Sequence, residues 1–253
     1  MKKYRVTAVF CLLLAIEVHA QFKNEGVYIN ITPGSSVIAL DGVVNTDGGT
    51  LTVEGTLRTP ADLTNTTSAT LQGNGQYFIG GNWTNDAVFN AGMSSVTFTG
   101  DQGSMVTSGG DAFYDLSLDK TTGDLTLADD MNVANTLDFQ AADNYIVLDN
   151  NNLQVLHITG YDATRHVRST GTGFLVRTVG GSPVVFPVGN TSYNPATLSN
   201  AGASDLYFVR VADAVLSDGD AGAPLTADAV DRTWFIEEGT PDGSDLTLEV
   251  QWN

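Results

Sequence analysis

Beyond residue 20, apolar and polar residues alternate with a period of two, and no stretch sustains the 3.6-residue apolar period of an amphipathic helix. The clearest runs lie at Leu51–Leu57, Met131–Phe139 and Leu246–Trp252. Successive side chains of a β-strand point to opposite faces, so each run predicts a strand with one buried face. Abundant Gly, Thr, Asn and Asp favour strands and turns over helices. The pattern predicts an all-β protein.

Turn signals separate these strands at intervals near ten residues, as at Asp47-Gly48-Gly49 and Gly73-Asn74-Gly75. Many short, evenly spaced strands are typical of a sandwich, a barrel or a β-solenoid. Between residues 35 and 160 the units are short and similar, and none could cover its own apolar face. Stacked coils solve that problem, so we predict right-handed β-solenoid-like repeats over residues 21–162, with a sandwich as the alternative.

The composition changes near residue 165, where Arg165, Arg168 and Arg177 lie close together and a cluster of prolines follows. Later strands are longer and more aromatic. We therefore predict a boundary at about 160–172 and an antiparallel β-sandwich domain over residues 163–253.

Three runs define the strands of this second region: Leu206–Val211, Asp231–Glu238 and Asp245–Trp252. The last two flank Gly239–Ser244, where Pro and Asp-Gly favour a turn, so we expect them to pair as an antiparallel hairpin. The chain ends at Asn253, directly after a strand, which indicates an N-terminal fragment of a longer protein with a truncated sandwich.

The first twenty residues have the pattern of a secretory signal peptide. Lys2, Lys3 and Arg5 form a positive segment ahead of the apolar run Val6–Ile16, and small residues precede a cleavage point after Ala20. The apolar run is too short to span a bilayer. We therefore expect a secreted or outer-surface location after cleavage.

The single cysteine, Cys11, lies inside that apolar run, so the mature chain could hold neither a disulfide nor a thiolate metal site. A secreted domain without disulfides favours a bacterial source. Cleavage would leave 8 Lys and Arg against 28 Asp and Glu. So acidic a surface repels nucleic acid phosphates, and no later stretch is long and apolar enough to span a membrane.

Two ordered series of residues resemble a known family. The first series is Gly80–Asn85, Phe89–Gly92, Val96–Gly100 and Phe113–Leu118. The second is Phe186–Gly189, Arg232–Ile236, Gly243-Ser244 and Gln251-Trp252. Together they resemble the repeats, and the domain that often follows them, in large cell-surface and secreted proteins of Bacteroidetes. The resemblance implies an extracellular β-rich architecture, an adhesin-like or surface-layer role, and type IX secretion by a C-terminal sorting domain outside this chain. It brings no catalytic residues.

Histidines and carboxylates offer few catalytic patterns. His157 lies on a predicted strand and His166 at the domain junction, and neither belongs to a zinc-binding or nucleophile motif. The pairs Asp129-Asp130 and Glu237-Glu238 are adjacent in sequence, so on a strand their side chains would point to opposite faces. Glycosidases need two carboxylates across a cleft, and we expect these to be solvated surface groups instead.

A Gly- and Ala-rich loop carries Asp213, Asp218 and Asp220, which could place several oxygens round Ca²⁺. The spacing departs from the EF-hand pattern, and a simple flexible loop is the alternative. Ca²⁺ is the one cofactor that the sequence suggests.

Aromatic residues could form platforms for sugars. Trp83 follows a turn and is the candidate for an exposed platform, whereas Trp234 and Trp252 lie in phase with apolar neighbours and are expected in the sandwich core.

The leading functional hypothesis is a non-enzymatic extracellular stalk or adhesin segment that presents binding or sorting domains. Its partners would be the secretion machinery and extracellular glycans or other cell-surface components. The alternatives are a carbohydrate-binding or polysaccharide-degrading β-helix protein, and a structural surface-layer or matrix protein.

Overall fold

The computed structural model describes residues 21–219, 221–227 and 229–252, and within them it contains strands and turns but no helix. The all-β prediction is confirmed over this range. The proposed signal peptide, with Cys11, lies outside the described residues, so export stays a prediction.

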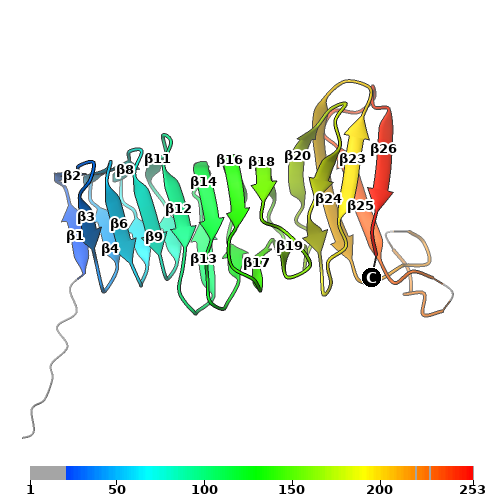
Figure 1. Ribbon diagram of the computed structural model, residues 1–253, viewed down its shortest axis with the longest axis horizontal. Helices are drawn as coiled ribbons and strands as arrows, with labels where there is room; N and C mark the ends of the chain where they lie inside the picture. Colours follow the sequence, from blue (N-terminus) through cyan, green and yellow to red (C-terminus); the bar gives the residue numbers. More distant parts are fainter. Residues whose placement is uncertain (1–20, 220, 228, 253) are drawn as a thin grey trace, which may run out of the picture.

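Most strands stack in parallel as a β-solenoid of about eight turns, which forms an elongated row (Figure 1). The β-solenoid of the prediction is thereby confirmed, and its right-handed coiling stays a prediction. One face of the coil is a nine-stranded sheet. Its strands, in spatial order, are β1 (Phe22–Glu25), β4 (Val43–Thr46), β7 (Leu63–Asn65), β10 (Trp83–Asn85), β13 (Ser104–Thr107), β15 (Leu125–Leu127), β17 (Asn144–Val147), β19 (Arg165–Arg168) and β22 (Val188–Gly189).

A ten-stranded sheet forms another face and continues into the second region. Its strands, in spatial order, are β3 (Ser36–Ile38), β6 (Thr56–Thr59), β9 (Gln76–Ile79), β12 (Ser95–Phe98), β14 (Phe113–Leu118), β16 (Met131–Phe139), β18 (Leu153–Thr159), β20 (Leu175–Val179), β24 (Asp205–Ala212) and β25 (Thr233–Glu238). A four-stranded sheet closes the early turns with β2 (Tyr28–Ile31), β5 (Thr50–Val53), β8 (Thr70–Gln72) and β11 (Val88–Asn90).

One turn of the coil takes about twenty residues, as the stack of Val43, Leu63 and Trp83 shows. The ten-residue spacing of turn signals therefore corresponds to about half a turn. Each turn buries the inward residues of its alternating strands against the turns above and below, and together they form one continuous apolar core.

Trp83 belongs to this core and is 0% exposed, so its predicted exposure is wrong. Although it follows a turn, it is already the first residue of β10 and is paired with Leu63 and Val106, which both face inward. Its indole packs against Phe89 at 4.9 Å and Phe113 at 5.2 Å between ring centroids. Together these aromatic rings fill the interior of the coil at this level.

A ladder of buried asparagines runs along one corner of the coil. Asn24 donates to Asn45 through Nδ2···Oδ1 at 2.8 Å, Asn45 donates to Asn65 at 2.8 Å, and Asn65 donates to Asn85 at 2.7 Å. Asn65 Nδ2 also donates to the Val88 carbonyl at 2.9 Å. The ladder thus ties each turn to the next and supplies partners for polar groups that the core would otherwise leave unpaired.

Lys120 is a second polar group within the coil, and its side chain is fully buried. Its Nζ donates to the Thr99 carbonyl at 2.9 Å and to Ser104 Oγ at 3.0 Å. Burial lowers the pKa of this ammonium below its usual value.

Parallel pairing continues through β18–β20 and β19–β22, beyond the predicted boundary near residue 162. The pairing then becomes antiparallel: β20 pairs with β24, and β24 with β25. A separate three-stranded antiparallel sheet contains β21 (Val184–Phe186), β23 (Ala196–Asn200) and β26 (Leu246–Val250).

The predicted hairpin across Gly239–Ser244 is wrong, because β25 pairs with β24 whereas β26 pairs with β23. The connecting loop bonds to the β23–β24 connection instead: Ala201 N donates to the Asp245 carbonyl at 2.9 Å, and Ala203 N donates to the Gly243 carbonyl at 3.1 Å. The chain therefore passes from one sheet to the other.

Trp252 is 57% exposed, which contradicts the expectation that it lies in a sandwich core. It follows the last paired residue of β26, Val250, and β26 is the edge of its sheet. Trp234 is half-buried and packs against the core, and its place in a sandwich stays a prediction.

The asparagine ladder gives a direct test of what holds the turns together. Asn65→Ala should lower the free energy of unfolding by about 3 kcal/mol, because it removes the bonds to Asn45 and to the Val88 carbonyl and leaves Asn85 Oδ1 buried without a partner. Urea unfolding followed by circular dichroism measures the change. Asn90→Ala, on the exposed side of β11, is the control and should change stability by less than about 0.5 kcal/mol. Equal losses in the two variants would contradict a stabilising ladder.

Candidate functional site

The outward side chains of the ten-stranded sheet stand in two columns, because its parallel strands are in register. Tyr77 and Ile79 face the core, so their neighbours Gln76 and Phe78 face outward, and the same alternation holds on each strand. The first column is Ser36, Thr56, Gln76, Ser95, Asp115, Thr136 and His157. The second is Ile38, Arg58, Phe78, Thr97, Ser117, Asp138 and Thr159.

A groove of ≈ 560 Å³ lies on this face between β9 and β16. Small residues of β12 and β14 line its middle: Ser95, Thr97 and Ser117. Larger side chains line the two sides, with Gln76 and Phe78 on β9 and with Asn135, Asp138 and Gln140 on or beside β16. The groove therefore forms because small side chains on β12 and β14 stand between larger ones on β9 and β16.

Two carboxylates in the groove are held in place by hydrogen bonds. Asp115 Oδ1 accepts from Asn135 Nδ2 at 2.8 Å and from Thr136 N at 3.2 Å. The second bond occurs where the register between β14 and β16 shifts, and such bulges change the direction of side chains. Asp115 is thereby fixed with its carboxylate at the groove.

Asp138 is fixed from two other directions. Its Oδ1 accepts from Thr159 Oγ1 at 2.6 Å, one turn further along the coil, and its Oδ2 accepts from Gln140 Nε2 at 3.1 Å. Asp119 adds a third carboxylate to the lining, and no Lys or Arg lines the groove. The site is therefore an acidic, hydrogen-bonding surface.

The sequence prediction missed Asp115 and Asp138 as a pair. They are 23 residues apart and become neighbours only once the twenty-residue turn and the register are known. Recognising that turn length in the sequence would have placed them on one face.

His157 lies on the outward face and is exposed, whereas His166 is 2% exposed at the junction of the two regions. The His166 ring packs against Tyr145 at 4.9 Å and Tyr193 at 5.1 Å between ring centroids. Burial, with a contribution from the charge of Arg168, lowers the pKa of His166 to about 4. At neutral pH it is an uncharged packing group.

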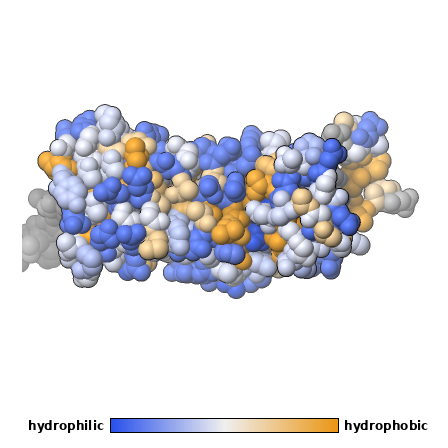
Figure 2. Space-filling view, turned by 90° about the horizontal axis from the view of Figure 1, so that it is seen from above, coloured by the Kyte–Doolittle hydropathy of each residue, from blue (hydrophilic) through white to orange (hydrophobic). Residues whose placement is uncertain are grey.

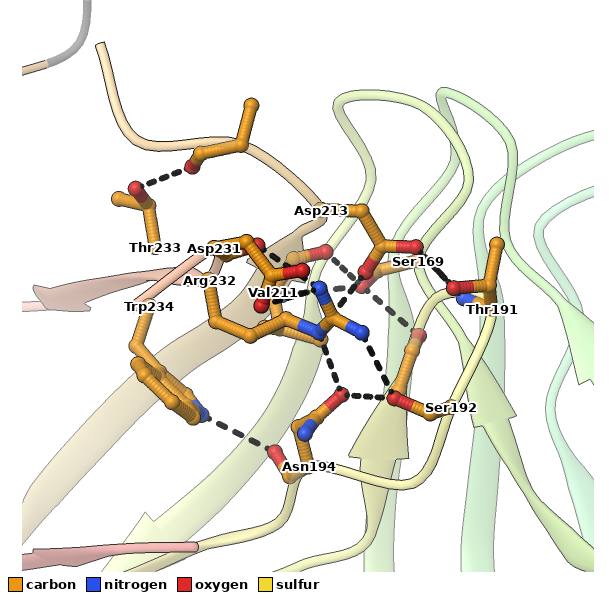
Figure 3. A network of polar contacts seen from close by, with 12 residues as sticks. Ser169, Thr191, Ser192, Asn194, Val211, Asp213, Asp231, Arg232, Thr233 and Trp234 are labelled. Carbon is orange, nitrogen blue, oxygen red and sulfur yellow. Dashed lines mark hydrogen bonds and ion pairs between the residues drawn. The ribbon is translucent and has the colours of Figure 1, made fainter. Parts of the chain in front are cut away.

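The predicted calcium residues are engaged in different ways. Asp213 accepts from Thr191 N at 3.1 Å and forms an ion pair with Arg232, whose Nε lies 3.2 Å from Asp213 Oδ1 (Figure 3). Asp218 lies in a turn, and Asp220 lies outside the described residues. No group of three or more His, Cys, Asp or Glu suited to a metal ion occurs within the described ranges. Calcium binding by this loop stays a prediction.

Arg232 is the centre of a network that also includes Ser192 and Asn194. Its Nη2 donates to Ser192 Oγ at 3.1 Å and its Nε donates to Asn194 Oδ1 at 3.2 Å, while Trp234 Nε1 donates to the Asn194 carbonyl at 3.0 Å (Figure 3). The network ties the start of β25 to the loop after β22, so its residues have a structural role.

Of the two predicted surface carboxylate pairs, Asp129-Asp130 has hydrogen-bond partners close by. Asp129 accepts from the backbone N–H groups of Ser108 and Gly109 at 2.7 and 2.8 Å, and Asp130 accepts from Asn152 N at 2.7 Å. Glu237 is an exposed residue of β25. Asp129 and Asp130 thus bond to different neighbouring turns of the coil and do not share one site.

Comparison of the chain with protein-family models, curated proteins and solved structures found no match. Among the described residues, no helix is long and apolar enough to cross a membrane.

The buried histidine predicts a pH dependence of stability. The pKa of His166 is lowered to about 4 in the folded state, so below pH 6.5 the unfolded chain binds a proton that the folded chain does not. The stability of the fold with a neutral His166 is fully present above pH 6.5 and is lost as the pH falls towards 4. Between pH 7 and 4.5 we expect a loss of about 2–3 kcal/mol from this residue.

Urea unfolding of the wild type and of His166→Phe at both pH values measures that contribution. The variant keeps a ring against Tyr145 and Tyr193 but cannot titrate, so its stability should fall less on acidification. His157→Phe, at an exposed position, should follow the wild type. Parallel pH profiles for wild type and His166→Phe would disprove the assignment.

Proposed function

We propose that this chain is a non-enzymatic extracellular rod, a stalk or adhesin segment that holds other domains away from a surface. The continuous stack of about eight turns carries the proposal. At a strand spacing near 4.8 Å, eight turns give a length of roughly 40 Å. Unlike a compact domain, a stack of this kind is lengthened simply by adding turns.

The surface chemistry supports an extracellular rod. The space-filling view is mostly hydrophilic, and apolar side chains gather mainly near the middle of the row and towards the end with the antiparallel strands (Figure 2). The whole chain has a formal net charge of −18, which favours solubility and weakens self-association. A stalk benefits from both properties, and a self-assembling surface layer does not.

We propose further that the two antiparallel sheets are the layers of a sandwich. Trp234 and Ile236 are paired with the buried Val211 and Val209, so they face the same side of the ten-stranded sheet. In the other sheet Val250 packs against the core and is paired with the buried Ala196. The loop between β25 and β26 crosses from one sheet to the other, as a sandwich connection does.

The sandwich proposal predicts that Ile236 packs between the layers. Ile236→Ala should lower the free energy of unfolding by about 2 kcal/mol, because a half-buried isoleucine loses three methyl or methylene groups. Glu237→Ala, the next residue on the opposite face of β25, should change it by less than about 0.5 kcal/mol. Urea unfolding followed by tryptophan fluorescence measures both, and equal effects would contradict the layered arrangement.

The rod proposal predicts a change of length when whole turns are removed. Deletion of residues 46–85 joins Asn45 to Asp86 and removes two turns in register, so the shortened protein should stay folded. Small-angle X-ray scattering of residues 21–253 and of the shortened form should show a maximum dimension smaller by roughly 10 Å. An unchanged dimension, or sheet-like assemblies of the intact protein, would count against a monomeric rod.

The same proposal predicts exposure outside the cell and no catalysis. An antibody raised against residues 21–253 should label intact cells of the organism that makes the protein. Incubation of purified protein with soluble polysaccharides should release no new reducing ends. Labelling only after permeabilisation would refute export, and sugar release would favour the polysaccharide-degrading alternative.

A further inference from the structure

We propose that the groove on the ten-stranded sheet binds an uncharged polysaccharide, with the sugar chain lying along the strand direction. This inference goes beyond the rod function, because a rod needs no groove. From β9 to β16 there are three strand spacings, or roughly 14 Å, which is wide enough for one extended sugar chain. The groove is open at the surface, so a long polymer could enter it from the side.

The hydrogen-bonding groups in the groove match sugar hydroxyls. Each hydroxyl both donates and accepts, and the lining offers carboxylates as acceptors, amides as donors and acceptors, and Ser and Thr hydroxyls as either. Asp115 and Asp138 are already oriented by bonds from Asn135 and Thr159, so binding would require little ordering of these side chains. Preorganised polar groups of this kind are typical of a specific site.

One side of the groove has an apolar element. Phe78 lines it, and the Arg58 guanidinium covers the ring at 3.6 Å from its centroid. Arg58 belongs to β6, on the side away from the groove, so the opposite face of the ring is turned towards Thr97 and β12. An aromatic face beside fixed polar groups suits the C–H face of a sugar ring.

Charge excludes other ligand classes. Asp115, Asp119 and Asp138 line the groove without a Lys or Arg, so uronates, sulfated sugars and phosphates would be repelled. No group of His, Cys, Asp or Glu side chains suited to a metal ion occurs among the described residues, so these carboxylates do not form such a group. A peptide strand could not extend this sheet here, because the groove lies on its face, where the backbone groups are already paired.

Affinity electrophoresis tests the proposal with purified residues 21–253 in native gels that contain laminarin, mannan or arabinoxylan, with polygalacturonate as the anionic comparison. At least one neutral polymer should retard the protein, and polygalacturonate should not. Ser117→Tyr fills the middle of the groove and should abolish retardation. Thr56→Tyr places the same side chain on the same sheet outside the groove and should bind like the wild type.

A second pair of variants tests the carboxylate. Asp138→Asn should weaken binding on the order of tenfold, because a charge-assisted hydrogen bond becomes a neutral one. Asp149→Asn is the matched control, since Asp149 also accepts from a threonine 21 residues later, Thr170 Oγ1 at 2.8 Å, but lies outside the groove. Circular dichroism melting should show that all four variants are folded.

Any one of three outcomes would overturn the proposal. These outcomes are no retardation by any of the three neutral polymers, equal retardation by polygalacturonate, and wild-type binding by a folded Ser117→Tyr variant. None of them bears on the rod function, which the scattering and labelling measurements test separately.

Discussion

In-register stacking of each turn on the next is the constraint on which the rest of the structure depends. A single turn contributes two or three short strands and a few inward apolar side chains, which it cannot cover by itself. Its neighbours supply that cover, and the buried asparagines fix the register at one corner with bonds of 2.7–2.8 Å. The outward columns follow from the same register, so the groove, with Asp115 and Asp138 on its surface, is a by-product of how the core is stacked.

Local sequence patterns predict the strands well because alternation depends only on neighbouring residues. The run at Met131–Phe139, for example, coincides with β16. What local patterns do not contain is the partner of each strand. Trp83 follows a turn, but its pairing with Leu63 places it in the core. The turn residues at Gly239–Ser244 would also suit a hairpin, but the loop bonds to Ala201 and Ala203 and β26 pairs with β23 in a different sheet.

The residues that suggested a family resemblance in the second region have a physical explanation in the fold. Arg232 and Trp234 both bond to Asn194, which follows the Phe186–Gly189 segment. The two sequence motifs are therefore two sides of one junction, where the coil gives way to antiparallel pairing. The same network occupies Asp213, one of the residues considered for Ca²⁺, with an arginine partner. Sequence spacing could not distinguish these two uses of an aspartate.

The asparagine ladder also has an electrical consequence. Each amide donates towards the C-terminal end of the rod, and Asn45, Asn65 and Asn85 also accept from the N-terminal side. The four side-chain dipoles, starting at Asn24, are therefore aligned head to tail. Aligned dipoles polarise one another and add, as peptide dipoles do in a helix. At the positive end, Asn85 Nδ2 donates to the Asp111 carboxylate at 3.0 Å. The solenoid thus contains a side-chain counterpart of the helix macrodipole. The acidic Asp111 caps its positive end, and the positive end of a helix also favours a negative charge.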